Sequence, residues 1–288
     1  MSPWGERAGM VERTFDGGGA GSVGRPGVGA VRLWGSGLSG GPAGVGAARA
    51  MARRAGERGV DRIGAADAYG PGTSERLLAE AIDVDRDDLL VATKGGLLRN
   101  RAGDWLAMGD PDYLRNAQLC SADRLGVDRI DLYQLHRPDP DTPFLDSVHA
   151  LAELRDEGAI RHVGLSNVSV DQLAAARDVV EIATVQNRYN VGYRDEAAVL
   201  EACADAGIGF VPWYPLAAGD LDGVEGLDAV ASAHDATRHQ IALAWLLHRS
   251  PVVLPIPGTA DPEHLAENVA AAEIDLTDDE VARLTAAA

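Results

Sequence analysis

Lysine is almost absent from this sequence. It occurs once among the 288 residues, at Lys94, and every other permanently cationic side chain is arginine. Arginine replaces lysine on a surface at little cost, but not where a compact ammonium group is needed whose pKa shifts readily on burial. Lys94 ends the apolar run 89–93 and precedes two glycines. Either one lysine escaped the arginine bias by chance, or position 94 requires it, and the neighbouring residues decide between these interpretations.

Other absences exclude whole classes of protein. The net charge of −18 argues against a nucleic-acid partner and an anionic membrane surface, since both are met by a basic face. No stretch approaches the roughly 18 apolar residues of a membrane span, and the first residues lack the apolar segment of a signal peptide. The two cysteines, Cys120 and Cys203, lie in segments of helical pattern without CxxC spacing. We expect buried thiols, no disulfide or metal site, and a cytoplasmic protein.

From residue 25 onward, short apolar runs alternate with longer segments of helical period, a pattern typical of βαβ units. Eight units in a chain of this length predict an α/β fold, an eight-stranded parallel (β/α)8 barrel in one domain over residues 1–288. We expect a flexible tail at 1–14 and a β-hairpin at 15–24, although the glycines at 17–19 also suit a longer tail. Strands are expected near 27–33, 60–64, 88–93, 129–135, 160–165, 182–186, 208–213 and 252–255, and helices near 43–58, 73–82, 111–125, 144–157, 170–178, 194–206, 226–234, 239–249, 261–271 and 277–286.

Three reactive side chains follow successive predicted strands, namely Tyr69, Lys94 and His136. Separately, Tyr69 fits an aromatic packed on the barrel rim and His136 fits a hydrogen-bonded core histidine. Active sites of such barrels lie at the C-terminal ends of the strands, so all three are expected to meet there. A neighbouring cation stabilises a phenolate, and an imidazole within reach of a carbonyl oxygen can orient it. The set therefore predicts proton transfer to an oxygen that acquires charge.

The sequence resembles the aldo-keto reductases from about residue 24 to residue 284. The resemblance rests on the motifs Ala-Asp-Ala-Tyr-Gly at 66–70, Ala-Thr-Lys at 92–94, the run 128–136 that ends in Leu-His, Val-Gly-Leu-Ser-Asn at 163–167, Val-Gln-Asn at 185–187, and Pro-Ile-Pro-Gly-Thr at 255–259 with Glu-Asn at 267–268. It implies hydride transfer from a nicotinamide cofactor to an aldehyde or ketone. By this resemblance Tyr69 is the general acid, Lys94 tunes it, and His136 orients the carbonyl group.

The resemblance also implies the cofactor contacts. Ser166, Asn167 and Gln186 match positions that hold the nicotinamide carboxamide, which needs a mixed set of donors and acceptors. Trp213 matches an aromatic that stacks on the nicotinamide ring, although it also suits the barrel core. NADPH is favoured over NADH by the family, but the loop 258–264 offers a 2'-phosphate only a histidine and a hydroxyl beside two acids. The remaining expected cofactor contacts are Pro215, Leu216, Gly258, Thr259, His264, Glu267 and Asn268.

One departure from the family pattern concerns position 64. An aspartate normally stands five residues before the catalytic tyrosine and pairs with the lysine, but this chain has Gly64 there. Lys94 would then be a buried cation without its partner, or would lose its proton. We therefore keep two alternatives to a carbonyl reductase: a redox-neutral dehydratase, isomerase or cyclase that uses Tyr69 as acid or base, and a subunit that binds the nucleotide without turnover.

The substrate is not specified by the sequence beyond a small carbonyl compound. Three aromatic residues, Trp34, Trp105 and Tyr214, lie in the loops 34–46, 97–108 and 213–226 that follow predicted strands. They favour an apolar or aromatic substrate, although they equally fit lids or the edge of the core. The sequence does not predict an oligomeric state.

Overall fold

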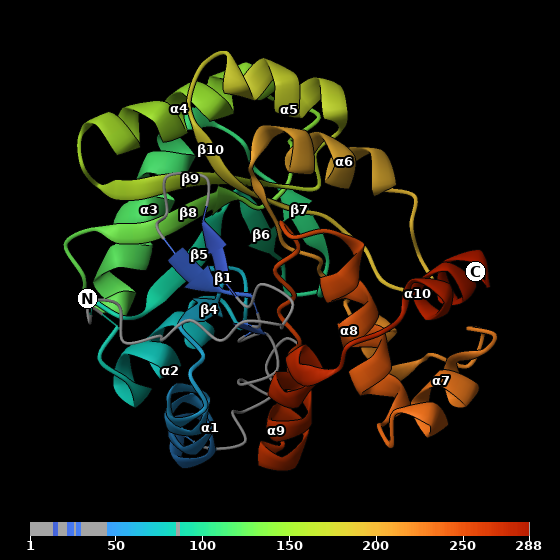
Figure 1. Cartoon of the computed structure of the whole chain (residues 1–288). Helices are drawn as coiled ribbons and strands as arrows, with labels where there is room; N and C mark the ends of the chain where they lie inside the picture. The colour runs from blue at the N-terminus through green and yellow to red at the C-terminus, as the bar shows by residue number, and fades with distance from the viewer. Residues whose placement is uncertain (1–13, 17–21, 26, 30–44, 85–86, 288) are drawn as a thin grey trace.

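The structure is a computed structural model that describes residues 14–16, 22–25, 27–29, 45–84 and 87–287. Seven parallel strands form a curved sheet, and helices surround it (Figure 1). The order of the strands in the sheet is β11-β10-β9-β8-β5-β4-β3. In sequence these strands are β3 (Val28–Gly29), β4 (Arg62–Gly64), β5 (Leu90–Gly95), β8 (Ile130–Leu135), β9 (Ile160–Ser166), β10 (Ile182–Gln186) and β11 (Gly209–Phe210).

An irregular segment closes the barrel between the two edge strands. Val253 forms a parallel bridge with Phe210 of β11. On the other side, Gly27 donates to the Pro255 carbonyl (3.0 Å) and Gly29 to the Pro257 carbonyl (3.4 Å). Leu254 also donates its N–H to the Phe210 carbonyl (2.8 Å), but Pro255 and Pro257 have no N–H group and can only accept, so the segment forms no regular ladder with β3. The eight-stranded barrel is confirmed, with residues 252–257 taking the place of a regular eighth strand.

Most strand residues are buried, as expected for parallel strands covered on the outside by helices. Side chains on the outer face of the sheet pack against the helices in one large core. On the inner face, Ala92, Leu132 and Ala183 form a small separate cluster. Small side chains here leave room in the barrel interior for the polar residues at the strand ends.

The helices agree closely with the ranges that the periodicity predicts. Three of them, α5, α8 and α10, begin with a capping box in which a Ser or Thr side chain and a Gln or Glu three residues later satisfy each other's backbone N–H groups. Their bounds are α1 (Val45–Glu57), α2 (Thr73–Ala81), α3 (Pro111–Leu125), α4 (Phe144–Asp156), α5 (Val170–Arg177), α6 (Ala197–Ala206), α7 (Leu227–Ala233), α8 (Arg238–Arg249), α9 (Pro262–Ala270) and α10 (Asp278–Ala286), with short 3-10 turns at Ala217–Gly219 and Ala271–Glu273. No helix among the described residues is long and apolar enough to cross a membrane.

Two antiparallel hairpins accompany the barrel. The expected N-terminal hairpin is present as β1 (Thr14–Asp16) and β2 (Ser22–Gly24). Thr14 was expected in the flexible tail but begins β1, and residues 1–13 lie outside the described residues. The second hairpin, β6 (Leu97–Arg99) and β7 (Trp105–Ala107), occupies a segment that we expected to be an irregular loop. In its turn, the Asn100 side chain donates to the Asp104 carboxylate (2.9 Å) and accepts a hydrogen bond from the Asp104 N–H (3.0 Å).

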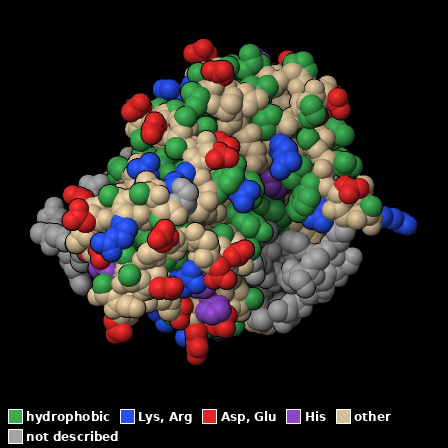
Figure 2. Space-filling view, turned by 90° about the vertical axis from the view of Figure 1, so that its right-hand side faces the viewer, with side chains coloured by type: hydrophobic (Ala, Val, Ile, Leu, Met, Phe, Trp, Pro, Cys, Tyr) green, Lys and Arg blue, Asp and Glu red, His purple; other side chains and the backbone are tan. Residues whose placement is uncertain are grey.

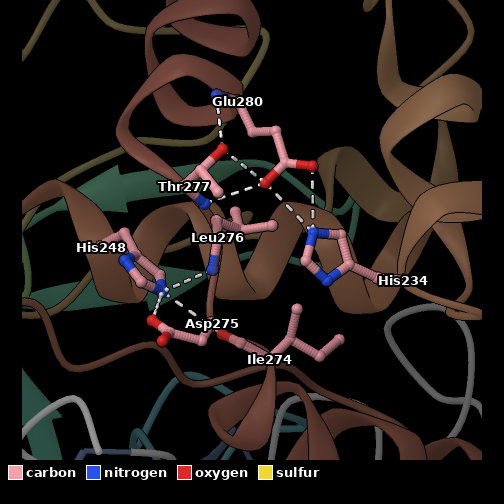
Figure 3. A network of polar contacts seen from close by, with 7 residues as sticks. All are labelled: His234, His248, Ile274, Asp275, Leu276, Thr277 and Glu280. Carbon is pink, nitrogen blue, oxygen red and sulfur yellow. Dashed lines mark hydrogen bonds and ion pairs between the residues drawn. The ribbon is translucent and has the colours of Figure 1, made fainter.

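Hydrogen bonds join residues 274–280, before and at the start of α10, to the helices that precede them in the chain (Figure 3). His234, just after α7, lies with its Nε2 3.1 Å from both carboxylate oxygens of Glu280 in α10. The Leu276 N–H donates to His248 of α8 (3.2 Å). Thr277 donates its N–H and hydroxyl to Glu280, both at 2.8 Å. These contacts hold α10 across the outside of the barrel, away from the strand ends that carry the reactive residues.

The expectation for the cysteines was wrong for one of them. Cys203 is buried in α6 as expected, but Cys120 is exposed on α3. The helical period of α3 places Leu114, Ala117, Ser121 and Leu125 on its buried face, and position 120 falls outside this face.

Candidate active site

Tyr69, Lys94 and His136 meet at the C-terminal ends of β4, β5 and β8. The Lys94 Nζ lies 5.6 Å from the centre of the Tyr69 ring. The rings of Tyr69 and His136 are 5.7 Å apart in an edge-to-face arrangement. The strand register brings them together, because the His136 N–H donates to the Gly95 carbonyl (2.8 Å). Figure 2 shows one face of the molecule, on which hydrophobic side chains lie among acidic and basic ones.

The Lys94 ammonium is buried, and its exposed fraction is 2%. Nζ donates to the Ala65 carbonyl oxygen at 2.8 Å. Burial lowers the pKa of Lys94 to about 8, while the negative charges of Asp67 and Glu75 act in the opposite direction. At pH 7 the charged form therefore still predominates, although it lacks the adjacent carboxylate of the family pattern.

A buried acidic cluster behind Lys94 supplies that opposing charge. Glu75 in the first turn of α2 is fully buried, accepts a hydrogen bond from the Thr93 hydroxyl (2.6 Å), and pairs with Arg124 of α3 (2.5 Å). Burial, followed by the charge of Glu75, raises the pKa of Asp67 to about 7. Asp67 Oδ1 is buried and has no hydrogen-bond partner. Thr93 and Lys94 point to opposite faces of β5, so the Glu75 carboxylate that binds Thr93 acts on Lys94 across the strand.

Glu75 was not among the residues predicted for the site, and Asp67 was assigned no role there. A signal for Glu75 was present, since position 75 shares a face of α2 with Leu78, three residues later, and that face packs on the barrel. A charged residue on the buried face of an amphipathic helix requires a partner. No comparable signal marks Arg124, which comes from a distant helix.

The acidities of the other two reactive groups are strongly shifted. Burial raises the pKa of Tyr69 to about 12, and the charge of Asp67 adds to this effect. Burial also holds the pKa of His136 well below its ordinary value of 6.5, with smaller contributions from Lys94 and Arg137. At neutral pH the phenol therefore keeps its proton and the imidazole is neutral. His136 Nδ1 is buried without a hydrogen-bond partner.

Gly64 ends β4 on the inner face of the barrel, where the family pattern has its aspartate. Its parallel partner on β5 is Ala92, and Lys94 follows two residues later on the same face. Among the described residues, a Cβ atom at position 64 would meet only Ile256 Cδ1, at an ordinary contact distance of 3.8 Å. A side chain can therefore begin at position 64 without a clash with the described residues.

The residues predicted to hold a carboxamide are also close together. Ser166 ends β9 and donates its hydroxyl to the Gln186 carbonyl (2.7 Å). Asn167 donates its amide to the His136 carbonyl and to the Ser166 hydroxyl, both at 3.0 Å, and accepts a hydrogen bond from the Trp213 indole at 3.0 Å. The φ angle of Asn167 is 59°, in the left-handed region that asparagine tolerates better than most residues. This mixed set of donors and acceptors fits a primary amide.

Of the three residues predicted to contact the substrate, the structure describes two, and only one of these lies against the reactive residues. Trp105 on β7 stands edge-on to Tyr69 with ring centres 6.4 Å apart, and lies 6.4 Å from His136. Tyr214 stacks edge-on against Trp213 and is 48% exposed, without a ring contact to Tyr69 or His136 in the described part of the chain. Trp34 lies outside the described residues. The structure thus brings Trp105, and not Tyr214, against the reactive residues.

The loop after the barrel-closing segment carries acids at the start of α9. The Thr259 hydroxyl accepts a hydrogen bond from the Asp261 N–H (3.0 Å), and the Asp261 carboxylate accepts one from the Glu263 N–H (2.8 Å). His264 is exposed in the same turn. This end of α9 is therefore already capped by a carboxylate, which does not fit a phosphate group. Of the other predicted cofactor residues, Pro215 and Asn268 are buried and Leu216, Gly258 and Glu267 are half-buried.

Comparisons with known proteins agree on one family. The family model described as the Aldo/keto reductase family matches residues 33–288. An uncharacterized oxidoreductase of Schizosaccharomyces pombe is 46% identical over 263 residues, covering 91% of this chain and 86% of that protein. Pyridoxine 4-dehydrogenase of Escherichia coli is 38% identical over 269 residues, covering 91% and 94%.

Solved structures extend the likeness to the fold. The structure of an aldo/keto reductase from Klebsiella pneumoniae, in complex with NADP and acetate, matches with a TM-score of 0.81 at 28% identity, covering 95% of this chain and 94% of that one. A thermostable aldo-keto reductase in complex with the inhibitor epalrestat gives a TM-score of 0.84 at 29% identity, covering 96% and 99%. This chain belongs to the aldo/keto reductase family.

Proposed function

We propose that this protein reduces an aldehyde or ketone with a nicotinamide cofactor, and that Tyr69 is the proton donor. The observation that carries the proposal is the convergence of Tyr69, Lys94 and His136 at three strand ends, with ring centres of Tyr69 and His136 5.7 Å apart. The amide-binding set of Ser166 and Asn167 next to them supports a carboxamide-bearing cofactor.

The nicotinamide, when bound, supplies the hydride. Tyr69 gives its phenolic proton to the carbonyl oxygen as negative charge develops there, and the Lys94 ammonium, 5.6 Å from the Tyr69 ring, stabilises the phenolate that remains. His136 cannot be the acid at neutral pH, because burial keeps its pKa well below 6.5 and the ring is neutral. One imidazole N–H can still donate to the carbonyl oxygen and orient it.

The choice between NADPH and NADH rests on two opposing observations. Structures of aldo-keto reductases from Klebsiella pneumoniae contain NADP or NADPH, and this likeness favours NADPH here. The start of α9 instead carries two acids, Asp261 at the N-cap and Glu263 in the first turn, which repel a 2'-phosphate. We propose that the protein accepts NADPH with less preference over NADH than a member with basic side chains at these positions.

A redox-neutral reaction is the second candidate, and Gly64 favours it. Without a carboxylate at that position, Lys94 has a pKa of about 8 and depends on Asp67 and Glu75 across the sheet for its charge. A Lys94 that loses its proton readily stabilises the Tyr69 phenolate less, so Tyr69 is a weaker acid. The same Tyr69 can then exchange a proton with carbon or oxygen in an elimination or isomerisation.

Isotope transfer separates the two candidates. With NADPH deuterated at the transferable position of the nicotinamide, a reductase delivers deuterium to the carbon of the product alcohol. Replacing Tyr69 by Phe should lower kcat by about 10² or more, the usual contribution of a general acid, while cofactor affinity in a fluorescence titration stays unchanged. A product without deuterium, formed at the wild-type rate, contradicts the reductase and supports the redox-neutral alternative.

A further inference from the structure

Arg99 lies beside the candidate active site in an unusual setting for a cation. It ends β6 and pairs across the hairpin with Trp105 of β7. Its guanidinium carbon lies 3.7 Å from the centre of the Trp105 ring, a close cation–π stack. Such stacking fixes the plane of the guanidinium while leaving its N–H edges free for a further partner.

The N–H groups of Arg99 have no partner in the described part of the chain. No ion pair or hydrogen bond of its side chain is present there, and Nε is buried without an acceptor. Burial lowers the pKa of Arg99, and the charge of the neighbouring Asp104 acts in the opposite direction. Its carboxylate instead accepts a hydrogen bond from the Asn100 amide (2.9 Å) within the hairpin turn. A buried N–H without an acceptor is unfavourable and is normally satisfied by protein, water or a ligand.

The position of Trp105 links Arg99 to the reactive residues. The Trp105 ring contacts Arg99 and also lies 6.4 Å from the Tyr69 ring and 6.4 Å from the His136 ring. A molecule with its carbonyl oxygen at Tyr69 and His136 can therefore lie along Trp105 and reach the guanidinium with its far end. In a protein of net charge −18, a fixed cation at this place attracts a negative group.

We propose that Arg99 is a specificity-determining residue that binds a carboxylate on the substrate, so that the preferred substrates are aldehydes or ketones that carry a carboxylate at the end opposite the carbonyl. The planar fork of a guanidinium matches a carboxylate in two parallel hydrogen bonds, and one positive charge balances one negative charge. An apolar or aromatic spacer packs on Trp105. This inference rests on the proposed reductase function, whose site it extends.

Two aldehydes that differ only in charge test it. 4-Carboxybenzaldehyde and methyl 4-formylbenzoate share the ring and the aldehyde, so the ratio of their kcat/KM values isolates the carboxylate. The wild type should prefer the carboxylate. Arg99→Met, which keeps an apolar chain on Trp105, should lower this ratio about tenfold, mainly through KM, because a charge-assisted pair is lost. Arg101→Met is the matched control, since Arg101 is exposed in the same hairpin, and it should leave the ratio unchanged.

Salt dependence of the wild type gives a test without a variant. Raising the salt concentration from about 50 mM to about 500 mM screens charge. If Arg99 binds the carboxylate, kcat/KM for 4-carboxybenzaldehyde falls and that for the ester stays constant. If the net negative charge of the protein dominates instead, salt raises kcat/KM for the carboxylate, and the inference is overturned. An equal fall in kcat/KM for both aldehydes in Arg99→Met also overturns the inference, because the residue would then act only on the hairpin.

A binding measurement separates this inference from the proposed function. Benzene-1,4-dicarboxylate cannot be reduced in this assay, so calorimetric titration into the NADPH-loaded protein reports recognition alone. Its affinity should be about tenfold lower in Arg99→Met and unchanged in Arg101→Met. If no aldehyde is reduced but this difference is found, the reductase proposal fails and the role of Arg99 stands. If aldehydes are reduced and the two variants bind the dicarboxylate equally, the reductase stands and the role of Arg99 is wrong.

Discussion

Gly64→Asp is expected to extend reductase activity to higher pH. A Cβ atom at position 64 meets no described residue except Ile256, whose Cδ1 lies at an ordinary contact distance of 3.8 Å. The backbone of Gly64 is also not in the left-handed region. The new carboxylate would project from the same inner face as Lys94, whose Nζ now donates to the Ala65 carbonyl. It would restore an adjacent negative charge to a buried ammonium.

The size of the effect follows from the pKa of Lys94, which burial lowers to about 8. Lys94 is charged below this pH, so wild-type activity should fall as the pH rises through about 8. An opposite charge within reach raises the pKa of a cation by about one to three units. At pH 9 only about a tenth of wild-type Lys94 remains charged, whereas most of it does in the variant. The ratio of kcat at pH 9 to kcat at pH 7 should therefore rise about tenfold, with little change at pH 7.

The assay is the pH dependence of kcat for one uncharged aldehyde, with NADPH at saturation. Tyr69 does not interfere, since its pKa of about 12 lies above the range. Gly64→Asn is the matched control, because it adds the same volume without charge and should leave the basic limb at about pH 8. A wild-type profile that is flat to pH 10, or an identical basic limb in Gly64→Asp and Gly64→Asn, would refute the assignment of this limb to Lys94.

Three other substitutions have defined outcomes. Glu75→Gln removes the charge that binds Arg124 at 2.5 Å and should lower the free energy of unfolding in urea by about 2 kcal/mol. Glu280→Gln tests the acid dependence of stability: hydrogen bonds from Thr277, followed by one from His234, lower the pKa of Glu280 from 4.5 to about 2, so its contribution is complete above pH 4.5 and is lost as pH falls through 2. The variant should show a flatter dependence of Tm on pH in this window. Asp261→Ser keeps a cap on α9 but removes its charge; NADPH affinity should increase severalfold relative to NADH in a fluorescence titration.

The alternation of apolar runs and helical periods was sufficient to predict the barrel and its helices. Both signals are local, since they depend on which face of a segment is buried. The hairpin of β6 and β7 was missed because its strands are only three residues long and half exposed, so they carry little apolar alternation. The irregular eighth strand was placed correctly, but its form depends on prolines 255 and 257 that accept hydrogen bonds from β3.

For the site, the predicted positions of the strand ends were sufficient to predict that Tyr69, Lys94 and His136 lie close together. Parallel strands in register have their C-terminal ends at the same end of the barrel. The effect of nearby charges on the pKa of Lys94 was not predictable from the strand ends. Burial lowers the pKa of Lys94, and the charges of Asp67 and Glu75, which come from other segments of the chain, act in the opposite direction. Arg99 was missed for a related reason, since its partner Trp105 lies across a hairpin that the sequence did not indicate.

A second buried cation shows why position 94 retains the chain's only lysine. Arg62, on β4, is 3% exposed, and burial lowers its pKa only to about 10, so it stays charged throughout the physiological range. Equivalent burial brings Lys94 to about 8, within reach of neutrality. An arginine at position 94 would hold a permanent charge whose strength the surroundings cannot adjust. With Gly64 in place of the family's aspartate, the protonation of the group beside Tyr69 is set by burial, which favours the neutral form, and by Asp67 and Glu75, which favour the charged form. Of the two basic side chains, only lysine has a pKa that this environment can bring near neutrality.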